Sequence, residues 1–329
     1  MSVKDEVLKT LEINKGQSFS GETLAGTLGV SRAAVWKAIT ALRKEGYPIE
    51  AATNKGYALL EDSDLLSEQG IRLHLSEETS TLPLHVYKTL DSTNLAAKRL
   101  ALENVSHGTV VISNEQTKGR GRLGRDFYSP ASTGIYLTIL LKPNFDLSKS
   151  VLITTAASVA VCRAIQKVCN VESEIKWVND VYINGEKICG ILTEAITDFE
   201  TGTIEYIASG IGINCHIPKT GFPDEIKNKV GAIQASFSRN ELAAEVINQM
   251  MLIYKNIETR DFITEYKKRS MILGKDIQVV KHYSKQPNSQ TPEAQTAVAI
   301  DIDNDGGLIV EYENGIRETL NTGEISIKL

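Results

Sequence analysis

The sequence predicts a multi-domain α+β protein made of a helical N-terminal unit, a central mixed-sheet unit and a small C-terminal β-barrel. Capped helical patterns fill residues 1–62, strands and helices alternate over residues 84–271, and short strands with tight turns occupy residues 272–329. A chain of 329 residues is long enough for two or three domains. We expect these three ranges as domains, joined by an acidic linker with a short helix over residues 63–83.

The composition is that of a soluble globular protein, with 42% hydrophobic and 23% charged residues. The net charge of −5 provides no overall basic field, so any nucleic-acid site must be local. The cysteines form no C-x-x-C pair and the histidines show no zinc-ligand spacing, so we expect free thiols in a reducing cytosol and no protein-bound zinc or iron. We find no signal peptide and no apolar run of about 20 residues, so we expect a cytoplasmic protein that does not contact membranes.

The N-terminal unit has the order of a helix-turn-helix. Ser20 and Ser31 are placed to cap two consecutive helices, and Gly29 and Gly46 are placed to end them. Short helix, glycine turn, longer helix and two-stranded hairpin together resemble the winged helix-turn-helix DNA-binding family. The expected helices and hairpin span residues 3–13, 20–28, 32–45 and 47–60.

The helix over residues 32–45 would face DNA if this resemblance holds. In that docking mode the first residues of the helix lie near base edges, which places Ser31, Arg32 and Ala33 there. Lys37 and the wing residue Lys55 would contact the DNA backbone. Acidic and basic side chains balance over the whole unit, so a protein-contact module with a solvated basic face stays open as the alternative.

The central unit mixes hairpin-type strands with helices and lacks a βαβ repeat, which favours an α+β domain. Strands are expected over residues 84–90, 108–113, 135–141, 175–178, 181–194 (with a turn at residues 184–185) and 203–214, and helices over 94–102, 150–168, 240–259 and 261–270. Further strands are expected over residues 277–281, 296–302, 308–312 and 316–321, and the turn signals between them predict a five-stranded, SH3-like barrel.

A glycine- and arginine-rich loop, EQTKGRGRLGR (residues 115–125, here the Gly-Arg loop), is the most distinctive stretch of the chain. Glycine permits close approach of the backbone to a ligand, and arginine supplies forked donors for phosphate or carboxylate. The loop also matches the G-x-G-x-x-G of dinucleotide-binding folds, but a strand rather than a helix follows it, so we interpret that match as accidental. A solvated basic turn is the alternative to an anion-binding loop.

Three further regions carry polar residues or glycines that a plain core does not need. DSTN (residues 91–94) opens a helix and alone is typical of a helix cap, KWVND (176–180) precedes GEKICGILTE (185–194), and GIGIN (210–214) is a glycine-containing strand. In this order, with the Gly-Arg loop and behind a helix-turn-helix, they closely resemble the bifunctional biotin–protein ligase and biotin operon repressor family over essentially the whole chain. Val178 departs from the proline usual in K-W-P-N-D, and we expect only a small change in local stiffness.

The resemblance implies an enzyme that joins biotin to ATP as biotinyl-5′-AMP and passes biotin to one lysine of a biotin carboxyl carrier protein. Lys187 and Arg122 would be catalytic, because positive charge offsets the repulsion between the biotin carboxylate and the α-phosphate. Mg²⁺ would accompany ATP, with Asp180 as its ligand. For Lys187, a surface lysine beside a hairpin turn is the alternative.

The resemblance also assigns binding residues to each substrate. Neutral polar groups and the Gly-Arg loop would bind biotin, namely Ser92, Thr93, Asn94, Gln116, Gly119, Arg120, Gly121, Arg122, Lys187 and Gly190. ATP and the adenylate would contact Arg122, Arg125, Phe127, Lys176, Asn179, Asp180, Lys187 and Asn214, with the Phe127 ring as the aromatic face for adenine.

In this family the adenylate-bound form dimerises and binds an operator, so biotinyl-AMP would be the corepressor of biotin synthesis and transport genes. We therefore expect a homodimer with the adenylate bound, and operator DNA and a carrier protein as partners. A ligase without regulation, a helix-turn-helix sensor without ligase activity and a lipoate ligase are the alternatives.

Overall fold

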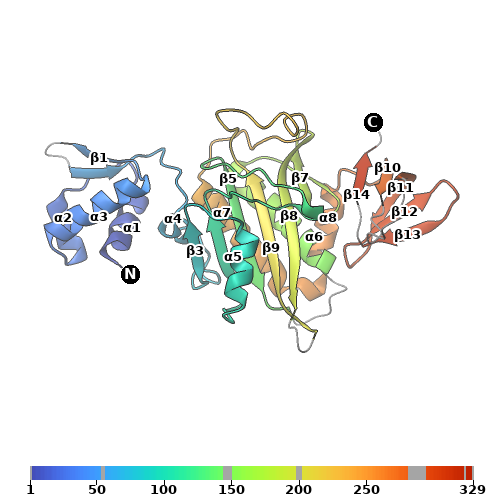
Figure 1. Ribbon diagram of the computed structural model, residues 1–329, viewed down its shortest axis with the longest axis horizontal. Helices are drawn as coiled ribbons and strands as arrows, with labels where there is room; N and C mark the ends of the chain where they lie inside the picture. Colours follow the sequence, from blue (N-terminus) through green and yellow to red (C-terminus); the bar gives the residue numbers. More distant parts are fainter. Residues whose placement is uncertain are drawn as a thin grey trace.

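The computed structural model describes residues 2–52, 56–143, 150–197, 202–280, 294–321 and 324–327. They form three units in a row, in the order of the chain (Figure 1). A helical unit stands at one end, a sheet with helices in the middle, and a small β-unit at the other end. The predicted fold class is confirmed at this level.

The N-terminal unit is the expected helix-turn-helix with a hairpin. Ser20 and Ser31 cap their helices by accepting a backbone N–H of the first turn, and Gly29 and Gly46 end them in the left-handed conformation. The turn of the wing, with Lys55, lies outside the described residues. The elements are α1 (Val3–Ile13), α2 (Gly21–Leu28), α3 (Arg32–Glu45), β1 (Ile49–Ala52) and β2 (Gly56–Leu59).

Residues 63–83 contain the expected short helix, α4 (Glu68–Arg72), and the segment is packed rather than extended. Ile71 of α4 is fully buried in the core of the central unit. The Ser67 hydroxyl donates to the Glu12 carboxylate of α1 at 3.2 Å, and the Ser67 backbone N–H donates to Asn240 Oδ1 at 3.0 Å. The segment therefore ties the N-terminal unit to the central one.

A buried arginine anchors the same segment. The Arg239 side chain is 2% exposed, and its Nε donates to the Asp64 carboxylate at 2.6 Å. The Arg239 backbone N–H donates to the other carboxylate oxygen at 2.8 Å, and Nη1 donates to the carbonyl of Gly134 in the central sheet at 3.0 Å. A buried guanidinium needs such a set of partners, because an unpaired charge in the interior is strongly destabilising.

The central unit is built on a seven-stranded mixed sheet in the order β3-β4-β5-β9-β8-β7-β6. β3 and β4 run parallel and all other neighbours run antiparallel. The predicted strands are present, and the turn at residues 184–185 separates β7 from β8. The strands are β3 (Leu84–Tyr87), β4 (Thr109–Ser113), β5 (Gly134–Leu141), β6 (Glu174–Lys176), β7 (Asp180–Ile183), β8 (Glu186–Thr197) and β9 (Ile204–Asn214).

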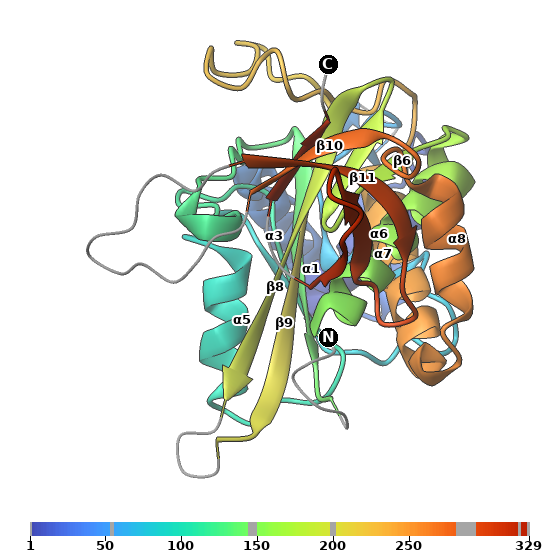
Figure 2. The same ribbon diagram turned by 90° about the vertical axis from the view of Figure 1, so that its right-hand side faces the viewer.

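Helices cover the two faces of this sheet unequally. Helix α5 (Thr93–Ala101) lies on one face, and α6 (Ser150–Cys169), α7 (Arg239–Lys255) and α8 (Asp261–Arg269) lie on the other (Figure 2). Helix α6 is long and apolar enough by composition to cross a membrane, but 72% of its apolar stretch is buried inside the protein. It is a core helix that packs against β7, β8 and β9 and lies between α7 and α8.

The C-terminal unit is a five-stranded antiparallel sheet in the order β13-β12-β11-β10-β14. Four strands were located from the sequence, and the fifth is β14 at the end of the chain. Among the described residues β13 and β14 do not pair, so the sheet is not a closed barrel in this part of the chain. The Trp177 indole N–H donates to the carbonyl of Gly306 at 2.9 Å and joins this unit to the central one. The strands are β10 (Asp276–Val280), β11 (Ala294–Ile302), β12 (Leu308–Tyr312), β13 (Arg317–Leu320) and β14 (Glu324–Ile327).

Removal of the Asp64 carboxylate tests the buried anchor. Asp64→Ala leaves the Arg239 charge buried without its partner, so we expect a loss of about 3 kcal/mol of unfolding free energy in urea denaturation. The matched control is Glu78→Ala, which breaks the exposed pair with Lys255 (61% and 65% exposed) and should cost less than about 1 kcal/mol. Equal effects of the two substitutions would contradict this role of Arg239.

Candidate active site

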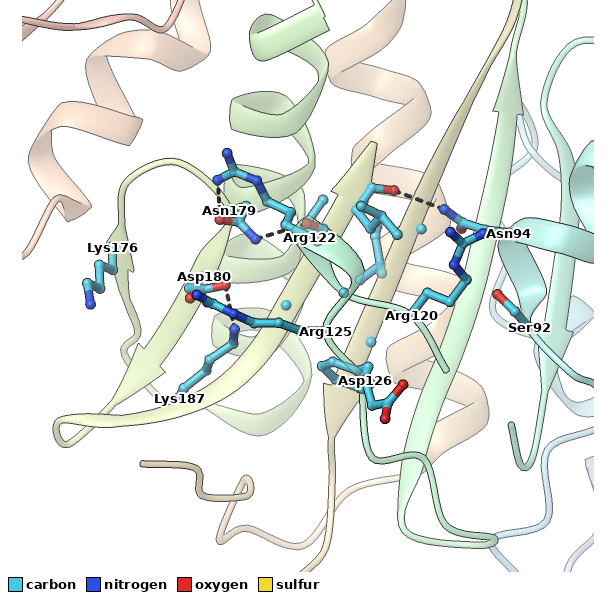
Figure 3. Close-up of a pocket in the computed structure, with 18 of the residues that line it drawn as sticks. Ser92, Asn94, Arg120, Arg122, Arg125, Asp126, Lys176, Asn179, Asp180 and Lys187 are labelled. Carbon is cyan, nitrogen blue, oxygen red and sulfur yellow. Dashed lines mark hydrogen bonds and ion pairs between the residues drawn. The ribbon is translucent and has the colours of Figure 1, made fainter. Parts of the chain in front are cut away.

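A cavity of about 520 Å³ lies on the face of the central sheet that carries α5 (Figure 3). Five stretches far apart in the sequence form most of its wall: the start of α5, the Gly-Arg loop with the residues just after it, the β6–β7 segment, the first half of β8 and the second half of β9. The lining residues predicted from the sequence are Ser92, Thr93, Asn94, Gln116, Arg120, Gly121, Arg122, Arg125, Phe127, Lys176, Asn179, Asp180, Lys187 and Gly190.

One end of the cavity, here called the neutral end, is lined mainly by uncharged polar side chains, and Arg120 lies there beside Asn94 (Figure 3). Ser92 occupies the N-cap position of α5, yet its hydroxyl makes no capping hydrogen bond. The helix-cap interpretation therefore does not account for this side chain, which lines the cavity instead. Gln116 Oε1 accepts from the Thr93 backbone N–H at 2.8 Å and from its hydroxyl at 3.2 Å, which joins the Gly-Arg loop to the start of α5.

Asn94 is fixed by partners on both sides of its amide. Its Oδ1 accepts from the Thr138 hydroxyl at 2.7 Å, and its Nδ2 donates to Glu194 at 2.9 Å and to the carbonyl of Leu192 at 3.2 Å. Burial raises the pKa of Glu194, but hydrogen bonds from Lys98 and Asn94 outweigh it, and the pKa lies below its ordinary value. Glu194 is thus an ionised acceptor, and Asn94 is a fixed part of the wall.

Glycines form the floor of the cavity. Gly190 of β8 pairs directly with Gly212 of β9. A Cβ atom at Gly212 would lie 2.5 Å from the Phe127 ring, and one at Gly210 would lie 2.1 Å from Asn94 Oδ1. Both distances are too short for real atoms, so only glycine lets the ring and the amide approach the strands this closely.

The other end of the cavity is cationic. The Lys187 ammonium lies 2.7 Å from the Asp180 carboxylate, with Lys187 29% exposed and Asp180 21% exposed (Figure 3). Arg122 Nη1 donates to Asn179 Oδ1 at 3.1 Å, and Asn179 Nδ2 donates to the carbonyl of Ile191 at 3.0 Å. The Arg122 side chain is therefore held against β8. Lys187 is therefore paired with a carboxylate of the cavity. This pairing disfavours the alternative that Lys187 is a solvated surface lysine.

Two of the residues predicted to bind biotin or ATP, Gly119 and Asn214, do not line the cavity. A Cβ atom at Gly119 would lie 2.3 Å from the carbonyl oxygen of Phe127, so this glycine lets the Gly-Arg loop fold back on itself. The Asn214 side chain donates to the carbonyl of Gly231 at 3.0 Å and holds the segment after β9. Any effect of Asn214 on a ligand in the cavity would be indirect.

Sequence reasoning missed several lining residues, which are Asp126, Trp177, Ile191, Leu192, Lys229, Val280 and Ile325. Lys229 arrives because its carbonyl accepts the backbone N–H of Lys187 at 3.1 Å. Val280 and Ile325 come from β10 and β14 of the C-terminal unit. No local motif marks these three positions, and only the tertiary arrangement brings them to the cavity.

Cys189 lies within the GEKICGILTE segment that contributes to the cavity. It is a buried free thiol, as are the other three cysteines. Burial raises the pKa of the Cys189 thiol well above its ordinary value. A neutral thiol is a poor nucleophile, so the site has no activated thiolate at this position.

On the helix-turn-helix, the Ser31 hydroxyl accepts the Ala34 N–H at 3.2 Å and serves as the cap of α3. Arg32, Ala33 and Lys37 are exposed on α3, as a DNA-facing surface requires. Their contacts with DNA stay a prediction.

Comparison with known proteins places each unit. The biotin/lipoate A/B protein ligase family matches residues 86–214, a helix-turn-helix domain family matches residues 4–58, and the biotin protein ligase C-terminal domain family matches residues 290–328. The bifunctional ligase/repressor BirA of Bacillus subtilis is 35% identical over 263 residues, with 80% of each chain covered. The Escherichia coli protein of the same name is 26% identical over 324 residues, covering 95% of this chain and 94% of that relative.

Among solved structures, the biotin protein ligase from Aquifex aeolicus in complex with biotin and ATP aligns with a TM-score of 0.61 at 26% identity. The alignment covers 75% of this chain and 98% of that one. A helix-turn-helix domain, a ligase domain and a C-terminal domain therefore follow one another in this chain. The curated relatives align with the chain over most of their own length. The chain belongs to the family of bifunctional ligase/repressor BirA proteins and is a biotin–protein ligase.

Proposed function

We propose that the cavity joins biotin to ATP as biotinyl-5′-AMP and then releases biotin to one lysine of a biotin carboxyl carrier protein. Family membership supports biotin ligation, and the Aquifex aeolicus relative, whose structure is described as a complex with biotin and ATP, supports this pair of substrates. The alternative of a sensor without chemistry is disfavoured, because sensing alone does not need a lysine and an arginine fixed around one anion-binding space.

The observation that carries the proposal is the convergence of two chemically different ends on one cavity. Lys187 and Arg122 stand at one end, and Ser92 stands at the other, next to Asn94 (Figure 3). The uncharged donors and acceptors of the neutral end suit the ureido ring of biotin. The cationic end suits the biotin carboxylate and the phosphates.

In the first step an oxygen of the biotin carboxylate attacks the α-phosphorus of ATP. The bond between that phosphorus and the oxygen bridging to the β-phosphate breaks, and pyrophosphate leaves. Two anions must meet, and negative charge grows on the phosphoryl oxygens in the transition state. Lys187 and Arg122 offset this charge from positions that Asp180 and Asn179 fix before the substrates arrive, which is how electrostatic preorganisation lowers a barrier.

Mg²⁺ fits the site only as a companion of ATP. No group of three or more His, Cys, Asp or Glu side chains among the described residues could hold a metal by itself. Mg²⁺ commonly takes one or two protein carboxylates together with substrate phosphates and water, and Asp180 in the cavity wall is the proposed carboxylate. When bound, Mg²⁺ supplies charge neutralisation along the triphosphate.

The Phe127 ring is the proposed aromatic face for adenine. It lies over the paired glycines of β8 and β9, with its edge toward Tyr136 at a centroid distance of 6.4 Å. Arg125 and Lys176 line the same space and suit the phosphates.

In the second step the ε-amine of the carrier lysine attacks the acyl carbon of biotinyl-AMP. The bond from that carbon to the phosphate oxygen breaks, AMP leaves, the amine loses a proton, and an amide remains. The neutral Cys189 thiol agrees with direct transfer to the carrier, without a covalent enzyme intermediate.

The N-terminal unit is the proposed repressor domain. With biotinyl-AMP bound, two copies of the chain would bind an operator as a symmetric pair, and the carrier protein would compete for the same adenylate. Ser67 contacts Glu12 of the N-terminal unit, and Asp64 contacts Arg239 of the central unit. These contacts support the proposal that ligand binding in the cavity affects the position of the N-terminal unit. We propose the cytosol as its compartment.

Lys187→Ala tests the proposed chemistry. Loss of the ammonium should slow biotin-dependent exchange of pyrophosphate into ATP by at least about 100-fold, the effect typical of removing one preorganised charge-stabilising donor. The matched control is Lys227→Ala on the nearby segment, where Lys227 is 54% exposed and pairs with Asp224. Normal exchange by a folded Lys187→Ala protein would contradict the assignment.

Gly210→Ala tests the glycine floor. The added methyl group would overlap Asn94 Oδ1, at 2.1 Å, and force the amide away from Thr138 and Glu194. We expect the KM for biotin to rise on the order of tenfold, equivalent to one lost hydrogen bond, with a smaller change in the KM for ATP. Gly26→Ala, where an added Cβ atom would meet nothing within 4 Å, is the control. An unchanged KM for biotin would show that biotin does not depend on this wall.

A further inference from the structure

A large aromatic residue stands exposed on the second helix of the helix-turn-helix. Helix α3 buries one face, formed by Val35, Ala38, Ile39 and Leu42, in the core of the N-terminal unit. Trp36 points away from that core and is 60% exposed. Its helical neighbours on the same side are Arg32 and Thr40, one turn before and one turn after it.

Exposure alone does not make Trp36 a contact residue, because single apolar side chains are common on protein surfaces. Its position is the informative point. Arg32, Ala33 and Lys37 are also exposed, so the indole stands in the first turns of α3 between two cations. The Thr40 hydroxyl donates to the Trp36 carbonyl at 2.8 Å and is used inside the helix. This side of α3 therefore offers an apolar surface framed by positive charge.

The charge of α3 favours a polyanion as the occupant of this face. The helix carries Arg32, Lys37, Arg43 and Lys44, and its first turn has no acid. The acid of α3, Glu45, is paired with Lys4 of α1 at 2.7 Å. The chain as a whole has a net charge of −5, so the positive charge on this helix is a local feature.

Arg43 also has a structural task. Its Nε donates to the carbonyl of Ile49 in β1 at 2.8 Å, and its guanidinium lies 5.9 Å from the centre of the Tyr57 ring in β2. Arg43 thus holds the wing against the end of α3. Arg32 and Lys37, which flank Trp36, have no such contact with the wing among the described residues.

We propose that Trp36 determines DNA sequence specificity by packing its indole against the C5 methyl groups of thymines in the major groove. Thymine alone among the four bases presents a methyl group there, and apolar side chains recognise it by contact. Arg32, one turn earlier, would reach the base edges, and Lys37 would reach the phosphates. The inference rests on the proposed DNA-binding function and deepens it.

The experiment replaces thymine by uracil, which lacks only this methyl group. Wild-type protein with biotin, ATP and Mg²⁺ first selects duplexes from a random-sequence library. The selected duplex is then made with thymidine and with 2′-deoxyuridine. Binding of both duplexes is measured by fluorescence anisotropy for the wild type, Trp36→Ala, Trp36→Phe and Ile13→Ala. Ile13 is the matched control, since it is 57% exposed at the end of α1, and circular dichroism checks that each variant is folded.

The wild type and Ile13→Ala should bind the uracil duplex about fourfold more weakly for each contacted thymine, the factor equivalent to about 0.8 kcal/mol for one buried methyl group. Trp36→Ala should bind both duplexes equally, and Trp36→Phe should keep part of the difference. Discrimination retained by Trp36→Ala, or absent in the wild type, would overturn the inference while leaving DNA binding intact. If the wild type selects no duplex, the proposed DNA binding fails, and this inference fails with it.

Discussion

The whole site depends on how closely other groups approach the backbone of β8 and β9. Gly190 and Gly212 pair across the two strands, and Gly210 lies beside Asn94. A side chain at either β9 position would occupy space that the Phe127 ring or the Asn94 amide now fills. Because these glycines bring the Gly-Arg loop and the start of α5 down onto the sheet, the neutral and cationic ends of the cavity face one shared space.

The second constraint is the buried charge that joins the units. Arg239 connects Asp64, at the exit from the DNA-binding unit, with Gly134 at the start of β5. Gly134 in turn pairs with Asn214 at the end of β9, the strand whose glycines form the cavity floor. One continuous set of polar contacts therefore links the strand of the cavity floor to the exit from the N-terminal unit. We propose this set of contacts as the route by which a corepressor would act.

Local chemistry explains which parts of the fold could be predicted. Ser31 with Gly46 delimits α3, and turn residues 184–185 mark a hairpin, because capping and turn geometry are set by neighbours in the sequence. Contacts between residues far apart in the chain leave no such signal in the local sequence. Lys229 reaches the cavity by pairing with Lys187, and Val280 and Ile325 arrive with a separate sheet. Asn94 was predicted as a ligand contact, and its wall-forming role depends on Thr138 and Glu194, far away in the chain.

Native mass spectrometry of the protein incubated with ATP, Mg²⁺ and either biotin or lipoate tests the central claim most directly. An acid that fits the neutral end of the cavity should be retained as its adenylate, held between that end and the cations Lys187 and Arg122. The account predicts a retained biotinyl-AMP mass, accompanied by a dimer, and no retained lipoyl-AMP. Retention of lipoyl-AMP in its place, or of neither adenylate, would contradict it.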